Sequence, residues 1–291
     1  MCRSIFIVVV LALAAASCSS ATSEESSTVA PVTVSTTTTT TVPSDEICKI
    51  GDLRFGTEGL VAALGEDVGD ATTISTIQWE DSATCERVVV AFASDSGAPA
   101  SSLGPTGVSV LAYAGIVRVV LPEGVDTTAV ADMLSDGDLA HRIFVVRDDE
   151  SHLFIDIHAE TGHTIGARAS TTSSPSTLII DIIDVESDST PAGVTVSPSS
   201  IVLTPTPGPT IYPFSVEGYA APSLEEIRVE VRSKGNLVGN RSLSLAGWSD
   251  AWQGYDTIIT DGPSGMVDIY VGTIGPEGEP DIGATLTVDL P

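Results

Sequence analysis

Short runs of alternating apolar and polar residues recur along most of the chain, and they constrain its fold more than any other feature. In segment 86–93, three apolar side chains fall on one face: Val88, Val90 and Phe92. Successive side chains of a strand point to opposite sides, so this spacing predicts a half-buried β-strand. Gly, Pro, Asp and Ser separate the runs and favour turns. The chain is therefore predicted to be all-β, with two antiparallel β-sandwich domains.

Similar runs predict the other elements. In the first domain the predicted strands are 73–79, 86–93, 108–112, 116–121, 142–147, 152–158, 164–169 and 178–183. In the second they are 201–204, 214–219, 226–233, 237–245, 256–260, 267–273 and 284–290. The sequence Lys234-Gly235-Asn236 predicts a hairpin turn. Two short helices are also expected, at 57–65, with Gly65 as its cap, and at 127–134, after an Asp126 cap.

The first twenty residues have the order of a secretory signal. Arg3 precedes an apolar run of about twelve residues, which is too short for the roughly twenty that a membrane-spanning helix needs. Small residues followed by Cys18 resemble the lipobox of bacterial lipoproteins, although Ala15 stands where Leu or Val is usual. We expect residues 1–18 to be a lipoprotein-type signal peptide, and lipidated Cys18 to anchor an extracytoplasmic protein to the membrane. Simple cleavage with secretion, or an uncleaved anchor, are the alternatives.

The remaining chain divides by composition. Residues 19–45 are rich in Ser, Thr, Val and Pro, with no apolar period that supports a core, and are predicted to be a disordered linker. The first folded domain is expected at 46–186 and the second at 196–291. A linker is expected at 187–195.

The chain is strongly acidic, with 39 Asp and Glu against 12 Lys and Arg, a formal charge of −27. A phosphate backbone requires a basic footprint, so we expect no nucleic-acid partner. The acidity also disfavours direct docking on anionic lipid. Solubility explains the charge, and attraction of Ca²⁺ or of a basic partner is the alternative.

Cys48 and Cys85 are the only cysteines outside the signal and the proposed lipid site. In an oxidising compartment they are predicted to form a disulfide. Closing a loop of about 38 residues stabilises a fold by roughly 4 kcal/mol in the chain-entropy model. Two thiols with no nearby pair of ligands are too few for a metal site.

The first domain resembles the AMIN-like domains of exported actinobacterial proteins over residues 73–184. The resemblance lies in Arg87-Val88-Val89-Val90, in the segment 108–121 and in the closing strand that follows Pro175, Leu178-Ile179-Ile180-Asp181-Ile182. The aromatic-Glu-Gly stretch that often precedes that family's penultimate strands is absent. The resemblance implies a β-sandwich used in envelope localisation, with cell-wall binding proposed for related domains.

The second domain resembles the immunoglobulin-like domain of bacterial spore-germination proteins over residues 196–291. The matching features are the segment 216–220, the strand 228–231, Trp248 and Trp252, and the turn 275–279 before a terminal strand. About seven short strands in roughly 95 residues suit an immunoglobulin-like sandwich. The resemblance implies an envelope module that is not an enzyme.

The segment 152–158 is the strongest candidate for chemistry. Strand spacing places His152, Phe154, Asp156 and His158 on one face. Asp156 and His158 are weak candidates for a metal site that His141 or His163 would complete. His152 and His158 are about 20 Å apart on a strand and cannot share an ion. The alternative is a solvated sheet face over an apolar one.

Aromatic side chains in the second domain suggest a second site. If exposed together, Trp248, Trp252 and Tyr255 would offer a stacking surface for sugar rings, and if buried they would anchor one end of the sandwich. No nucleophile elbow, Ser-x-x-Lys or HExxH motif is present, so no catalytic residue and no cofactor are predicted. The leading expectation is a non-catalytic envelope protein that binds or is positioned at the cell-wall glycan. A scaffold for envelope proteins is the first alternative, and a hydrolase the weaker one.

Overall fold

The computed structural model describes residues 48, 54–82, 84–127, 131–187 and 190–291. All regular secondary structure in these residues is β, which confirms the all-β prediction. Residues Val42–Pro291 form one compact unit. The predicted signal peptide, the lipidation site Cys18 and the linker 19–45 lie outside the described residues. Within the described part, no helix is long and apolar enough to cross a membrane.

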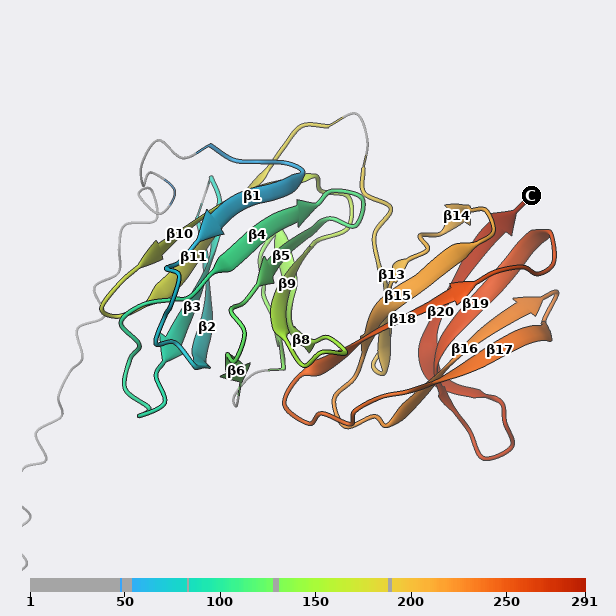
Figure 1. Ribbon diagram of the computed structural model, residues 1–291. Coiled ribbons are helices and arrows are strands. Elements are labelled where there is room, and N and C mark those ends of the chain that lie inside the picture. Colours follow the sequence, from blue (N-terminus) through green and yellow to red (C-terminus); the bar gives the residue numbers. More distant parts are fainter. Residues whose placement is uncertain (1–47, 49–53, 83, 128–130, 188–189) are drawn as a thin grey trace, which may run out of the picture. The chain divides into compact units, whose positions relative to one another are not determined.

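The strands of the N-terminal half end before residue 185 (Figure 1). They are β1 (Gly59–Leu64), β2 (Thr73–Asp81), β3 (Glu86–Ala93), β4 (Thr106–Leu111), β5 (Ile116–Val120), β6 (Asp126–Thr127), β7 (Asp132–Leu134), β8 (Ala140–Arg147), β9 (Leu153–Ala159), β10 (Ile165–Thr172) and β11 (Thr177–Asp184).

The strands of the C-terminal half begin at residue 195. They are β12 (Thr195–Val196), β13 (Ser200–Thr204), β14 (Gly208–Pro209), β15 (Phe214–Ala220), β16 (Glu226–Ser233), β17 (Asn236–Ser244), β18 (Trp252–Ile259), β19 (Gly265–Ile274) and β20 (Pro280–Leu290).

Three sheets are built from these strands. The shared sheet has ten strands in the order β1-β4-β5-β9-β8-β18-β15-β13-β12, with β7 paired to β8. The first flanking sheet has the order β10-β11-β3-β2-β6, and the second flanking sheet the order β14-β20-β19-β16-β17. A short parallel pairing of β8 with β18, at Val146–Trp252 and Arg147–Gln253, carries the shared sheet through both predicted domains.

Each flanking sheet packs on one part of the shared sheet. The first core joins residues of the first flanking sheet, such as Phe92 and Ile180, to residues such as Ile155 of the shared sheet. The second core joins Val229 and Ile269 of the second flanking sheet to Val216 of β15. The predicted inward face of segment 86–93 is buried, and so are Ile227, Val229 and Val231 of segment 226–233, because period-two alternation assigns one face of a strand to the core.

A third core lies on the opposite face of the shared sheet. It joins Ile116, Phe144 and Val146 of β5 and β8 to Tyr219 and Trp252 of β15 and β18. The two halves of the chain therefore contact each other through buried side chains as well as through the β8–β18 pairing. The sequence predicted only a linker between them.

Both predicted helices are wrong. Residues 59–64 form β1, which pairs along β4, and Leu60 is 67 % exposed. In the second segment, Asp126–Thr127 pairs with β2 and Asp132–Leu134 pairs with β8, while residues 128–130 lie outside the described part. Pairing with a neighbouring strand satisfies the backbone hydrogen-bonding groups of these segments, whereas a helix this short is only marginally stable by itself.

The predicted hairpin turn forms between β16 and β17. Lys234 and Gly235 both have positive φ, at 51° and 79°. Two consecutive positive φ angles match the twist of a two-residue hairpin, and glycine adopts that conformation without steric cost.

Candidate functional site

The face of β9 that carries Asp156 and His158 is buried. The alternative expectation, that this face of the sheet is solvated, is therefore wrong. Asp156 is completely buried and His158 is 4 % exposed. The third core covers them, with Tyr219 and Trp252 contributed by the C-terminal half. The alternating pattern correctly predicts which side chains of β9 share a face. One face packs in the first core, and the opposite face packs against the third core.

The Asp156 carboxylate is fully engaged by two side chains. Arg118 donates from Nε to Oδ1 at 2.9 Å and from a terminal nitrogen to Oδ2 at 2.7 Å. The hydroxyl of Tyr219 also donates to Oδ2. Burial alone would lower the pKa of Arg118, but the hydrogen bonds and the charge of Asp156 outweigh it and raise that pKa. Burial, and then the negative charge of Asp156, raise the pKa of Tyr219. This cluster fastens the N-terminal half to the C-terminal half.

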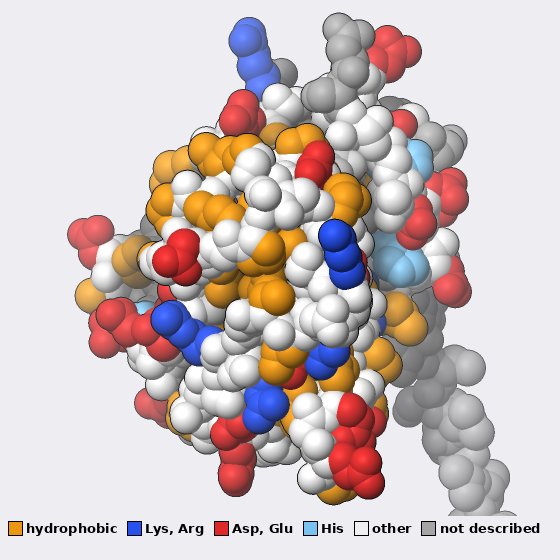
Figure 2. Space-filling view, turned by 90° about the vertical axis from the view of Figure 1, so that its right-hand side faces the viewer, with side chains coloured by type: hydrophobic (Ala, Val, Ile, Leu, Met, Phe, Trp, Pro, Cys, Tyr) orange, Lys and Arg blue, Asp and Glu red, His pale blue; other side chains and the backbone are white. Residues whose placement is uncertain are grey.

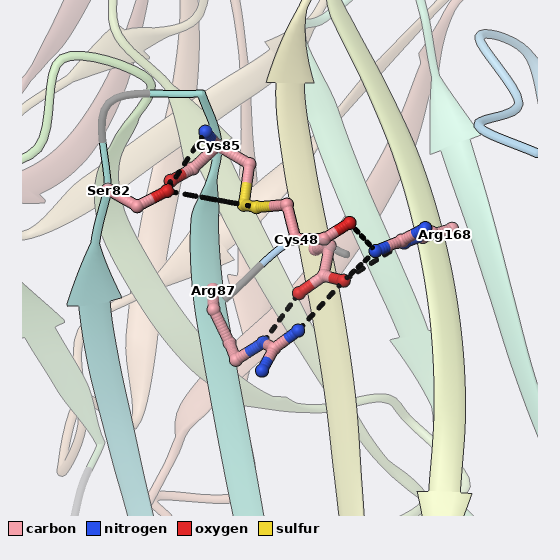
Figure 3. The surroundings of a disulfide bond; sticks show 6 residues. Cys48, Ser82, Cys85, Arg87 and Arg168 are labelled. Atoms are coloured by element: carbon pink, nitrogen blue, oxygen red, sulfur yellow. Dashed lines mark hydrogen bonds and ion pairs between the residues drawn. A yellow bond between two sulfur atoms is a disulfide. The ribbon is translucent and has the colours of Figure 1, made fainter. Parts of the chain in front are cut away.

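Asp156 and His158 do not converge on a metal site. Among the described residues, the one group of three potential ligands close enough to share an ion is Cys48, Cys85 and Asp181. Cys48 and Cys85 form the predicted disulfide, with their Cα atoms 6.2 Å apart, so they offer no thiolates. Asp181 is held by Arg87 at 2.6 Å and by Arg168 at 2.9 Å. Figure 3 shows both arginines beside the disulfide.

The three aromatic side chains proposed for sugar stacking do not form an exposed surface. Trp252 is 3 % exposed and Tyr255 is 8 % exposed. Trp252 packs edge-on against Phe144, and the hydroxyl of Tyr255 donates to the Ile201 carbonyl at 2.8 Å. Trp248 is partly exposed and lies under the guanidinium of Arg147, 5.1 Å from its ring centre. The burial of Trp252 and Tyr255 favours the packing interpretation for these two side chains.

A pocket of about 270 Å³ opens next to the third core, and we call it the histidine pocket. The ends of β8 and β9, the β9–β10 loop and residues 191–196 surround it. It brings together three histidines that are separate in sequence: His141, His158 and His163. The fourth, His152, does not line it.

Carboxylates accompany the polar residues of this pocket. His141 Nδ1 lies 2.9 Å from Glu160, and His163 Nδ1 lies 3.4 Å from Asp184. Arg142 forms an ion pair with Asp132. The guanidinium of Arg142 also lies over the ring of Phe144, 4.7 Å from its centre. The charges around the pocket are therefore largely paired within the protein.

Two nitrogens of the pocket are buried and have no hydrogen-bond partner, namely Nε of Arg142 and Nε2 of His158. The His158 ring packs edge-on against Phe144, with ring centres 4.8 Å apart. Burial lowers the pKa of His158 to about 4, so the imidazole is neutral near pH 7. A buried polar group without a partner costs about 1–3 kcal/mol. Because solvent does not reach either nitrogen, both lie beneath the surface of the pocket, and the polar groups open to a ligand are those of its rim.

Sequence reasoning named His141, His158 and His163 but linked them to a metal ion and to Asp156. It missed Arg142, whose role depends on its position opposite His158 across the β8–β9 pair. Knowing that Arg142 pairs with His158 across β8 and β9 would have identified this residue. The sequence does not give that register unless the pairing strands and the turn between them are known. No protein-family model, curated protein or solved structure matches the chain.

Proposed function

We propose that this chain is a non-catalytic, lipid-anchored protein of the cell envelope that binds cell-wall glycan. The signal-like N-terminus with Cys18 and the Ser/Thr-rich segment 19–45 support the compartment. The disulfide Cys48–Cys85 agrees with an oxidising environment. The resemblance of residues 73–184 to AMIN-like domains and of 196–291 to an immunoglobulin-like envelope module supports the same role.

The histidine pocket is the observation that carries the binding role. It is concave and combines apolar side chains such as Phe144 and Val194 with polar ones such as His141. A mainly pre-formed pocket with a few convergent polar groups is the usual form of a ligand site.

Asp156, in the segment that is the strongest candidate for chemistry, is the residue at which the hydrolase alternative would be tested. That carboxylate is buried and holds Arg118 and Tyr219, so it has no free oxygen directed at solvent or at the histidine pocket. A general acid or base must reach its substrate within hydrogen-bond distance. The geometry of Asp156 therefore supports a structural role.

A sedimentation assay tests the proposal. The purified mature chain, with Cys18 replaced by Ser so that no lipid is attached, is mixed with insoluble peptidoglycan and centrifuged. We expect it to sediment with the wall in a saturable manner. Retention no greater than that of an unrelated β-sandwich protein of similar charge would contradict wall binding.

The edge strand β17 favours protein scaffolding as the second candidate function. Among the described strands, β17 pairs with β16 alone, and its Leu237 and Val238 are 46 % and 50 % exposed. Ile258 of β18, 50 % exposed, and Val238 line a common groove. Figure 2 shows hydrophobic side chains among polar ones on the face that includes the second flanking sheet.

An open strand edge beside apolar side chains can accept an extended segment of another protein. Crosslinking in cells, followed by purification, tests this role. Recovery of one envelope protein with the wild type but not with a Val238→Lys variant would favour scaffolding over wall binding.

A further inference from the structure

We infer that the free edge of β17 binds an extended protein segment as an added antiparallel strand, and that this segment places a carboxylate opposite Arg241 with apolar side chains two residues to either side. This inference rests on protein scaffolding, the second candidate function, and specifies the chemistry of the partner. It follows from the main-chain groups of β17, the groove beside that strand and the charges of the β16–β17 hairpin.

The main chain of β17 has hydrogen-bonding groups that β16, its one strand neighbour in the described part, does not use. Just beyond the two strands, the Leu245 N–H donates to the Glu225 carbonyl at 2.8 Å. Hydrogen-bonded and non-hydrogen-bonded pairs alternate along an antiparallel ladder, and the register is regular over residues 239–244. The N–H and C=O groups of three residues therefore point away from β16: Asn240, Ser242 and Ser244.

This edge is longer and more accessible than the other sheet edges. β6, β12 and β14 are two residues long. β10 is mostly buried and pairs with Gly56 at Ala167, and β1 is bulged between Leu60 and Ala62. In β17, seven of nine residues are exposed. Short, covered or bulged edges resist strand addition, whereas a long, regular and exposed edge accepts it.

A groove of about 150 Å³ lies beside the edge. Val238 and Ile258, each 50 % exposed, provide apolar surface in it. The side of β17 that carries Arg241 faces this groove, because Arg241 pairs with Val229 of the second core and both line the groove. Every second side chain of an added strand would enter the groove, where apolar side chains remove that surface from water.

The β16–β17 hairpin is basic within an acidic protein. Residues 226–244 contain four Lys and Arg side chains and two Glu side chains, whereas the whole chain has a formal charge of −27. Arg228 and Arg232 share the buried Glu230 as their ion-pair partner. The hairpin therefore attracts an acidic partner that most of the protein surface would repel.

Arg241 makes the edge selective for a carboxylate. It donates to the Thr257 hydroxyl at 2.8 Å, and no carboxylate of the described residues pairs with it. Asp261 also lines the groove, but it lies four residues beyond Thr257, about 13 Å along an extended chain. In an added antiparallel strand, the residue opposite Arg241 belongs to a non-hydrogen-bonded pair, in which side chains are closest. A carboxylate there is attractive, whereas an unpaired inward charge opposes strand addition.

A second copy of the chain fits this edge less well. In the registers that overlap most, twofold pairing of two β17 strands places the two Arg241 side chains opposite or diagonal to each other, where like charges are destabilising. Each copy also carries a formal charge of −27. Main-chain groups spaced for a strand favour a polypeptide over an anionic glycan, so the partner is an acidic segment of another protein.

NMR titration of the isotope-labelled, unlipidated mature chain tests the inference. The probes are two capped heptapeptides that differ in one residue, Thr-Val-Thr-Glu-Thr-Val-Thr and Thr-Val-Thr-Lys-Thr-Val-Thr. We expect saturable shifts of the β17 amide signals with the glutamate peptide. Binding of the lysine peptide should be about tenfold weaker, because an attractive contact becomes a repulsive one. The net charge alone favours the lysine peptide, so equal binding, the opposite order or no binding would overturn the inference.

Two matched variants locate the charge. Arg241→Gln should reduce the roughly tenfold preference for the glutamate peptide to about equal binding, since both the attraction and the repulsion are lost. Lys234→Gln makes the same charge change at the hairpin turn, outside the groove lining, and should leave the preference unchanged. A preference that survives Arg241→Gln would refute the site. If that variant does not fold, the two peptides still decide on the wild type.

A third peptide and a glycan test strand pairing. N-methyl groups on the two threonines that flank the glutamate keep every side chain but remove N–H groups that would face β17, and binding should be lost. Equal binding of the methylated peptide would refute strand addition. Polygalacturonate, a polymer of uronic acids, is the other probe. Binding that depends on Arg241, without binding of the glutamate peptide, would assign the edge to an anionic glycan and overturn the inference.

Failure of this inference is distinguishable from failure of protein scaffolding. Recovery of an envelope protein by crosslinking, without a preference for the glutamate peptide, would reject the acidic strand and leave scaffolding intact. Peptide binding at β17 without a recovered partner would reject scaffolding in cells and leave the chemistry of the edge intact.

Discussion

Replacing Asp156 with Asn should sharply destabilise the whole 42–291 unit. The substitution keeps the shape of the side chain but removes the charge that Arg118 and Tyr219 share. Removing one partner of a buried ion pair costs about 3–5 kcal/mol, because the other partner is left buried without compensation. The Arg118 side chain is 28 % exposed and regains some hydration, so we expect the lower end, about 3 kcal/mol.

A double-mutant cycle with Tyr219→Phe tests whether the cluster joins the two halves of the chain. Tyr219→Phe removes one hydrogen bond to a charged acceptor and should cost about 1.5 kcal/mol. Groups in one hydrogen-bond network are not independent, so the double variant should lose about 1 kcal/mol less than the sum of the single losses. Urea unfolding followed by tryptophan fluorescence and by circular dichroism measures all four proteins.

His152→Gln is the matched control for this cycle, because His152 is partly exposed and its charge partners are at the surface. Its free energy of unfolding should lie within about 0.5 kcal/mol of the wild type. A loss below about 1 kcal/mol for Asp156→Asn, or strictly additive effects of the two substitutions, would refute the role of the cluster.

Three further predictions concern the disulfide, the buried histidine and the N-terminus. Replacing Cys85 with Ala opens the loop closed by Cys48 and should lower the free energy of unfolding by about 4 kcal/mol, measured by urea unfolding without reductant; an equal midpoint would contradict this. The pKa of His158 falls from 6.5 to about 4 on folding, so between these pH values the unfolded chain binds more protons and stability rises with pH, by about 3 kcal/mol in total. His158→Phe should flatten this part of the stability profile, and an unchanged slope between pH 4.5 and 6.5 would oppose the assignment. Mass spectrometry of the mature protein should find a diacylglyceryl-modified Cys18 at the N-terminus, whereas an unmodified terminus at another residue would overturn the anchor.

The sequence predicted the fold class well because strand periodicity is a local property. Alternation in segments such as 86–93 and 226–233 fixes which side chains enter the core, and Lys234-Gly235 fixes a turn through its backbone preference. The helix expected at 57–65 failed because β4, more than forty residues away, decides the structure of β1. A short segment with weak propensity follows its pairing partner.

The candidate site was less predictable, since it depends on contacts between distant segments. Nothing near Asp156 in the sequence indicates that Tyr219 covers it, 63 residues later. The histidine pocket likewise requires the register of Arg142 with His158 and the path of residues 191–196. Sequence patterns name the polar residues of such a site, but only the fold decides which of them share a pocket.

Sedimentation with insoluble peptidoglycan, applied to three proteins side by side, tests whether the histidine pocket holds the wall. The unlipidated mature chain and its His152→Gln variant should sediment with the wall to the same extent. The Thr161→Trp variant, in which a large ring on an exposed residue of the pocket rim covers its mouth, should remain in the supernatant. Equal sedimentation of all three proteins would show that the wall is held elsewhere, and sedimentation of none would contradict wall binding itself.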